Sequence, residues 1–144
     1  MNDVKQISSF LQKVPLFRGL DTRHREHLAR RFVQRQFEAS QTMVTQGQGG
    51  EGFFVIVSGK ADVILERSDG TKAVVNTFGP MDFFGELALL DDGLRTASVV
   101  ATEATLCLVL TRWDFLALLR EDAEMAVAVL QELARRFRRV LDAL

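Results

Sequence analysis

The chain has 144 residues, 47% of them apolar and 26% charged, which suffices for one domain with a buried core. Its formal net charge of −1 disfavours a dedicated nucleic-acid-binding domain, because such domains usually carry a clear basic excess. The single cysteine excludes an internal disulfide framework, and no uncharged apolar run is long enough to span a membrane. Since the N-terminus lacks a signal-peptide pattern, we expect a cytoplasmic protein.

Residues 4–35 show the periodicity of helices with one break. Apolar residues recur at helical spacing until Pro15, which ends the first pattern. Either Asp21 or Thr22 is placed to cap a second helix. The apolar face of that helix would consist of Leu28, Ala29 and Phe32.

Residues 36–111 consist of short runs of β-forming residues separated by glycines. The sequence Ser68-Asp69-Gly70 lies between two alternating segments and predicts a hairpin. Cys107 lies within an apolar run and is expected to be buried as a small hydrophobic residue. Regularly spaced short strands favour an antiparallel roll or barrel, and with the flanking helices an α+β fold. The expected strands are 41–45, 52–58, 61–66, 72–78, 97–101 and 105–110.

Residues 112–144 return to helical periodicity and include a heptad-like stripe. The stripe contains Ala126, Leu130, Leu133, Phe137, Val140 and Leu144. Its spacing alternates between four and three residues, as in a coiled-coil seam, but it is too short to hold a coiled coil alone. It either packs on the strands or forms a dimer seam. The neighbouring arginines 135, 136, 138 and 139 are typical of a solvated helix face.

Catalytic and metal sites are poorly supported by the sequence. It contains no nucleophile elbow, no phosphate-binding P-loop and no His-Glu-x-x-His motif. The only histidines, His24 and His27, lie among arginines, and this cationic neighbourhood opposes binding of a metal cation. We therefore predict no catalytic residue and no metal ligand.

An anion-binding site is predicted around Gly85. A helical turn that starts after this glycine leaves the backbone amides of Glu86, Leu87 and Ala88 free to meet an anion. The planar guanidinium of Arg95 suits a phosphate, whereas the carboxylate of Glu86 suits a sugar hydroxyl. A compact ribose phosphate satisfies both groups. The alternative is an ion pair between Glu86 and Arg95 that only ties a loop to the roll.

Two segments carry a resemblance to a known family. Phe-Gly-Glu-Leu-Ala-Leu-Leu at 84–90 and Arg-Thr-Ala-Ser-Val at 95–99 closely resemble the phosphate-binding cassette of cyclic-nucleotide-binding domains. The resemblance implies an antiparallel β-roll, a jelly-roll-like double-stranded β-helix, between N-terminal helices and C-terminal hinge and lid helices. It covers nearly the whole chain as a single domain. Its expected parts are N-terminal helices 1–35, a β-roll 36–111 with the cassette at 84–101, and C-terminal helices 112–144.

The same resemblance implies no cofactor and assigns roles to residues. Glu86 would bind the ribose 2′-hydroxyl and Arg95 the cyclic phosphate, with Gly85 allowing the backbone to approach. The remaining phosphate contacts would come from Leu87, Ala88, Thr96 and Ala97. The sugar and base would contact Val63, Val75 and Phe84. The base would be capped by candidates on the last helix, namely Arg136, Phe137, Arg139 and Val140.

Three features of the sequence depart from the family pattern or leave the choice between adenine and guanine undecided. Met81 stands where the family often has glycine in the turn before Asp82. The last helix lacks the hydroxyl pair that reads adenine in the catabolite activator. Thr96 directly follows Arg95, as in domains that favour cyclic GMP, yet channels that respond to cyclic AMP share it. We expect cyclic AMP in preference to cyclic GMP on family frequency.

The resulting expectation is a non-enzymatic cyclic-nucleotide sensor whose C-terminal helix moves on binding. Its partners would be the nucleotide and a second copy of the chain, bound through the C-terminal helix. Neither a membrane nor nucleic acid is expected to bind these residues alone. The alternatives are the sensor part of a transcription factor like the catabolite activator, whose DNA-binding module is absent from this chain, and a dimerising scaffold with a non-functional pocket.

Overall fold

A computed structural model describes residues 3–49, 52–85, 90 and 93–144. The chain divides into two compact units. One unit contains the strands and spans Arg31–Phe115, and the other contains helices from both ends, Met1–Arg30 and Leu116–Leu144. The expectation of a single domain over residues 1–144 stays a prediction.

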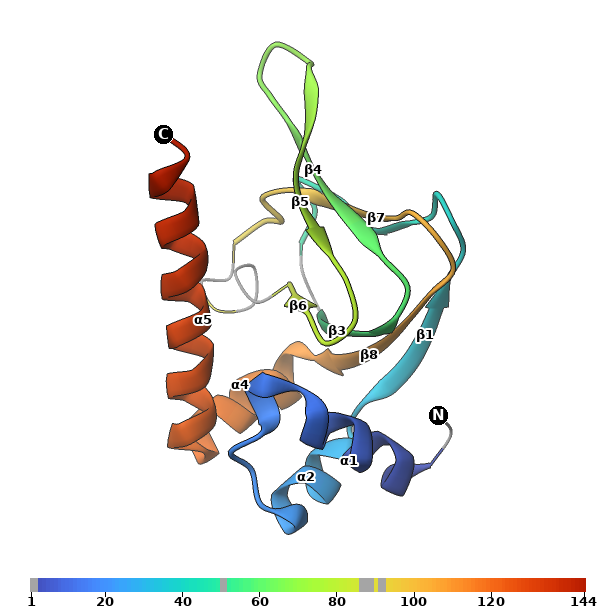
Figure 1. Ribbon diagram of the computed structural model, residues 1–144, viewed down its shortest axis with the longest axis vertical. Helices are drawn as coiled ribbons and strands as arrows, with labels where there is room; N and C mark the ends of the chain where they lie inside the picture. The colour runs from blue at the N-terminus through green and yellow to red at the C-terminus, as the bar shows by residue number, and fades with distance from the viewer. Residues whose placement is uncertain (1–2, 50–51, 86–89, 91–92) are drawn as a thin grey trace. The chain divides into compact units, whose positions relative to one another are not determined.

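Eight antiparallel strands form two four-stranded sheets in the strand unit (Figure 1). The first sheet contains, in spatial order, β1 (Val33–Phe37), β8 (Thr105–Thr111), β3 (Gly52–Ser58) and β6 (Phe83–Phe84). The second sheet contains β2 (Thr42–Val44), β7 (Ser98–Ala101), β4 (Ala61–Glu66) and β5 (Lys72–Phe78). The predicted α+β fold with an antiparallel β-roll is confirmed.

Most strand predictions are confirmed, but two strands were missed. β3, β4 and β5 have the predicted bounds, and β2, β7 and β8 differ from them by one residue at one end or both. The expectation of helix up to residue 35 is wrong, because α2 ends at Ala29 and β1 begins at Val33. Only Phe37 of β1 is buried, so this strand lacks an apolar alternation. Its pairing with β8, from Val33 opposite Val109 to Phe37 opposite Thr105, determines its conformation. β6 has only two residues, too few to give a periodic signal.

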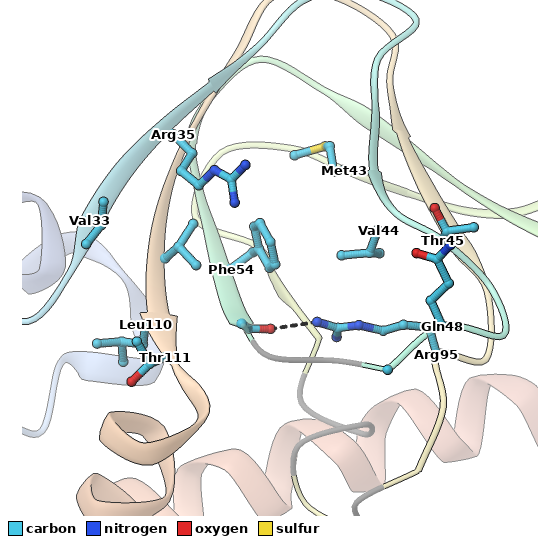
Figure 2. Close-up of a pocket in the computed structure, with 13 residues that line it drawn as sticks. Val33, Arg35, Met43, Val44, Thr45, Gln48, Phe54, Arg95, Leu110 and Thr111 are labelled. Carbon is cyan, nitrogen blue, oxygen red and sulfur yellow. Dashed lines mark hydrogen bonds between the residues drawn. The ribbon is translucent and has the colours of Figure 1, made fainter.

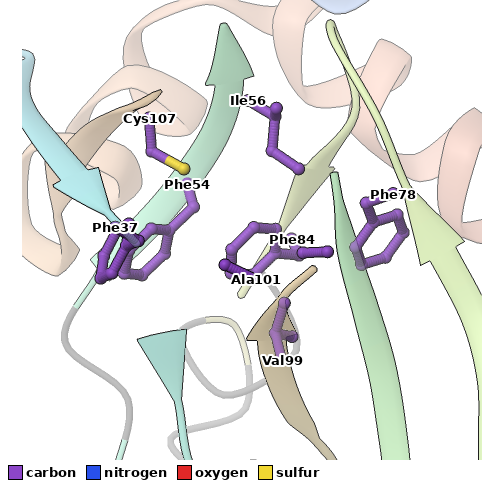
Figure 3. Packing of buried hydrophobic residues seen from close by; sticks show 9 residues of the cluster. Phe37, Phe54, Ile56, Phe78, Phe84, Val99, Ala101 and Cys107 are labelled. Carbon is purple, nitrogen blue, oxygen red and sulfur yellow. The ribbon is translucent and has the colours of Figure 1, made fainter. Parts of the chain in front are cut away.

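The two sheets face each other across an aromatic core (Figure 3). The ring of Phe84 stacks on Phe54 with centroids 4.8 Å apart and on Phe78 with centroids 5.6 Å apart. Cys107 is fully buried in this cluster, as predicted, and burial raises the pKa of its thiol to about 12. The buried members are Phe37, Phe54, Ile56, Ala61, Phe78, Phe84, Val99, Ala101 and Cys107.

Aspartate side chains cap three helices. Asp3 accepts a hydrogen bond from the backbone N–H of Gln6, and Asp122 accepts one from Met125. Of the two predicted caps for the second helix, Asp21 is the N-cap, and its carboxylate accepts from the N–H of His24 at 2.8 Å. The helices of the described residues are α1 (Val4–Lys13), the 3-10 turn η1 (Pro15–Phe17), α2 (Thr22–Ala29), α4 (Arg112–Glu121) and α5 (Ala123–Asp142).

The heptad-like stripe runs along α5. Its members Leu130 and Phe137 are each 63% exposed, and Val140 and Leu144 are also exposed. Met125 and Val129, on another face of the same helix, are buried. A dimer seam requires apolar side chains that are exposed in the single chain, and these members of the stripe meet that requirement. Among the described residues, no helix is both long and apolar enough to cross a membrane.

Candidate ligand-binding site

Gly85 occupies a position that only glycine fits. Its φ of 99° lies in the left-handed region, which residues other than glycine rarely adopt. A Cβ there would lie 2.6 Å from the carbonyl oxygen of Gly52 and 2.7 Å from Nη1 of Arg95. Because Gly85 has no side chain, its backbone lies next to both the Gly52 carbonyl and the Arg95 guanidinium.

Hydrogen bonds fix Arg95 through its backbone and its side chain. Its backbone N–H donates to Gln48 at 2.8 Å, and its carbonyl accepts from the N–H of Gly47 at 2.9 Å. Its guanidinium donates through Nη1 to the Gly85 carbonyl at 2.9 Å. Through Nη2 it donates to the Gly52 carbonyl at 3.0 Å, the bond drawn as a dashed line in Figure 2. The side chain is buried, with the residue 7% exposed. The guanidinium is thus oriented between the first residue of β3 and the residue that follows β6.

The other predicted contacts lie on several elements of the strand unit. Phe84 is buried in the aromatic core, whereas Val63 is half-buried and packs against that core from β4. Val75 is 53% exposed on β5. Thr96 is exposed and Ala97 is half-buried, just after Arg95. The predicted contacts Glu86, Leu87 and Ala88 lie outside the described residues.

The four candidate base caps belong to α5 in the helical unit. Glu132 binds Nε of Arg136 at 3.4 Å and Nη2 of Arg139 at 3.2 Å. Phe137 and Val140 are exposed. Their role as base caps stays a prediction.

A cavity of about 440 Å³ adjoins Arg95 within the strand unit (Figure 2). Among the described residues, Arg95 is the one that both lines this cavity and belongs to the predicted contacts. Sequence reasoning missed Arg35, because it placed this residue in a helix. It also missed the Gly52 carbonyl, for which the glycine-rich run at 47–52 was the available signal. The described lining residues are Val33, Arg35, Met43, Val44, Thr45, Gln48, Gly49, Gly52, Phe54, Arg95, Val109, Leu110 and Thr111.

The sequence profile of the family described as "Cyclic nucleotide-binding domain" matches residues 34–122, more than half of the chain. The chain belongs to this family. The matched range contains both Gly85 and Arg95, so the structural arrangement around the arginine lies within the family domain.

Known proteins similar to this domain are regulators or receptors by name. The "Cyclic AMP receptor protein" of Thermus thermophilus is 36% identical over 124 residues, which are 86% of this chain and 57% of that protein. The "cAMP-dependent protein kinase regulatory subunit" of Dictyostelium discoideum is 38% identical over 114 residues, 77% of this chain and 35% of that protein. The solved Thermus thermophilus catabolite activator protein superposes with a TM-score of 0.81 at 35% identity, covering 88% of this chain and 59% of that chain. The domain thus spans about half or less of the length of these curated relatives.

Proposed function

We propose that this domain binds a cyclic nucleotide, cyclic AMP in preference to cyclic GMP, and acts as a non-enzymatic sensor. The observation that carries the proposal is the oriented Arg95 next to Gly85, within a domain of this family. The names of the Thermus and Dictyostelium relatives support cyclic AMP as the ligand.

Arg95 and Gly85 have complementary tasks in this proposal. The two carbonyl hydrogen bonds orient the guanidinium before the ligand arrives, which reduces the ordering cost of binding. Arg95 pairs with the cyclic phosphate, and Gly85 keeps the backbone clear of it. Glu86 accepts a hydrogen bond from the ribose, while Leu87, Ala88, Thr96 and Ala97 complete the phosphate contacts. Val63, Val75 and Phe84 provide the apolar contacts to sugar and base.

The output proposed for the domain is a change in the position of α5. The helix supplies the base caps Arg136, Phe137, Arg139 and Val140, so the bound purine favours one of its positions. The exposed stripe on α5 supports a homodimer formed through the same helix. The nucleotide leaves chemically unchanged.

Calorimetric titration with cyclic AMP and cyclic GMP tests the proposal. We expect saturable binding, with cyclic AMP the tighter ligand, and a loss of about thirty-fold or more in Arg95→Gln, since losing a desolvated charge contact costs roughly 2–5 kcal/mol. Arg95→Lys keeps the charge but not the planar fork and should also bind weakly. Arg67→Gln, an exposed position in the β4–β5 hairpin, is the matched control and should bind like the wild type. No detectable binding by the wild type at millimolar nucleotide would end the proposal.

A further inference from the structure

The cavity beside Arg95 is lined by other strands than those that carry the predicted contacts Val63, Val75 and Phe84. β1 and β2 are edge strands of the two sheets, and β6 and β5 are the opposite edge strands. The cavity is lined by residues of β1, β2, β3 and β8. The predicted contacts Val63, Val75 and Phe84 lie on β4, β5 and β6. The two sets of residues therefore lie mostly on different strands, although Arg95 belongs to both and Phe54 of the cavity stacks on Phe84 in the core.

The lining of the cavity combines an apolar wall with positive charge. Met43, Val44, Phe54 and Val109 supply apolar contact area. Thr45, Gln48 and Thr111 add neutral polar groups, and Arg35 and Arg95 add two guanidinium groups. No carboxylate occurs among the described lining residues. The cavity therefore favours a ligand with one anionic group and an apolar body.

Arg35 is placed to bind the anionic group. It projects from β1 into the space bounded by Met43, Val44 and Phe54 (Figure 2). Its guanidinium makes no hydrogen bond or ion pair with any described residue, and the guanidinium carbon lies 5.6 Å from the ring centroid of Phe37. Arg35 is exposed, and a guanidinium without an acidic partner beside an apolar cavity is available to pair bidentately with a carboxylate.

We propose that this cavity is a second ligand site, which binds a small amphipathic monocarboxylate. The carboxylate pairs with Arg35, and the apolar body lies against Val44, Phe54 and Val109. The volume of about 440 Å³ falls within the range of roughly 300–1,000 Å³ that is typical of small-molecule sites. Binding here does not require that the cassette bind a nucleotide, so the two proposals can fail separately.

Amide-detected NMR titration with octanoate tests the site. Octanoate should produce saturable shifts of the backbone amides of Arg35, Val44 and Val109, which lie on three different strands around the cavity. Octan-1-ol, which has the same chain without the charge, should bind at least about ten-fold more weakly. Arg35→Gln should raise the octanoate dissociation constant by about ten-fold or more, whereas Arg67→Gln should leave it unchanged.

Each of the following results would overturn the second site. The first is that millimolar octanoate shifts none of these three amides saturably. The second is that octanol binds as tightly as octanoate, and the third is that Arg35→Gln binds octanoate as tightly as the wild type while its amide spectrum shows a folded domain. A cyclic AMP titration that shifts the same three amides and displaces octanoate would show one site, not two.

Discussion

Met81 has a backbone conformation that suits glycine better than methionine. Its φ of 73° is the left-handed value that the third residue of a type II turn requires, and Pro80 precedes it in the favoured second position. The turn is closed by a hydrogen bond from the N–H of Asp82 to the Gly79 carbonyl at 3.1 Å. The family often has glycine here, and the structure shows that the turn retains its form with methionine in the strained position.

Met81→Gly should therefore stabilise the domain by about 0.5–1 kcal/mol. The left-handed conformation costs a residue with a Cβ roughly 1–2 kcal/mol, and glycine avoids this cost. The greater freedom of glycine in the unfolded chain offsets part of the resulting gain in stability. Urea unfolding measures the difference, with Met81→Ala as the control that keeps the Cβ. If the glycine variant is no more stable than the alanine variant, the turn does not carry this strain.

Gly85→Ala should weaken nucleotide binding as well as the fold. The added Cβ would overlap the Gly52 carbonyl and the Arg95 guanidinium, so it displaces the group proposed to bind phosphate. Gly70→Ala is the matched control, because Gly70 also has a positive φ, of 87°, but no atom within 4 Å of the added Cβ. Both variants should lose about 1–3 kcal/mol of stability through backbone strain, and calorimetry should show weakened binding in Gly85→Ala alone. Equal nucleotide affinities of the two variants would contradict the role of Gly85.

Burial of Cys107 should make stability depend on alkaline pH. The pKa of the thiol rises from 9.0 to about 12 on folding, mainly by desolvation. Above pH 9 the unfolded chain loses the thiol proton while the folded chain keeps it, so stability falls as pH rises toward 12. Relative to Cys107→Val, which cannot ionise, the wild type should lose stability between pH 9 and pH 11 in urea titrations. A constant difference over that interval would show that the native thiol ionises as readily as the unfolded one.

At the scale of elements, a strand was predicted correctly where its own residues show the apolar pattern of a strand. β3 is a continuous apolar run after Gly52 and before the turn at Gly59, and its bounds were predicted correctly. β1 reads Val-Gln-Arg-Gln-Phe and gains its conformation from hydrogen bonds to β8, about 70 residues away in the chain. The misassignment of β1 is also the reason that Arg35 was overlooked.

The exposed stripe on α5 predicts a dimer that polar substitutions disrupt. Replacing Leu130 and Phe137 together by glutamate places two charges in the seam and should convert a dimer into monomers, because unpaired buried charges are costly. Light scattering measures the mass of each variant. Gln131→Glu, at an exposed position next to Leu130, is the control and should remain dimeric. A monomeric wild type, or a dimeric double variant, would contradict the seam.

At the scale of the whole molecule, the sequence motif identified the family and predicted Gly85 and Arg95 as residues of the site. Gly85 and Arg95 lie together as the cassette spacing predicted. The partner carbonyl of Gly52 was not predictable from spacing, because it is a backbone group 43 residues from Arg95 in the chain. Side-chain type shows which residue can bind an anion, whereas the groups that orient it depend on the tertiary fold.

NMR mapping of the cyclic AMP site tests whether the nucleotide binds beside Gly85 and Arg95. Addition of cyclic AMP to the uniformly labelled chain should shift the amides of Val63, Gly85 and Arg95 saturably, with one dissociation constant for all three. The Arg95→Gln variant should show these shifts only at much higher nucleotide concentration. Absence of saturable shifts, or shifts confined to β1 and β2, would contradict nucleotide binding at this site.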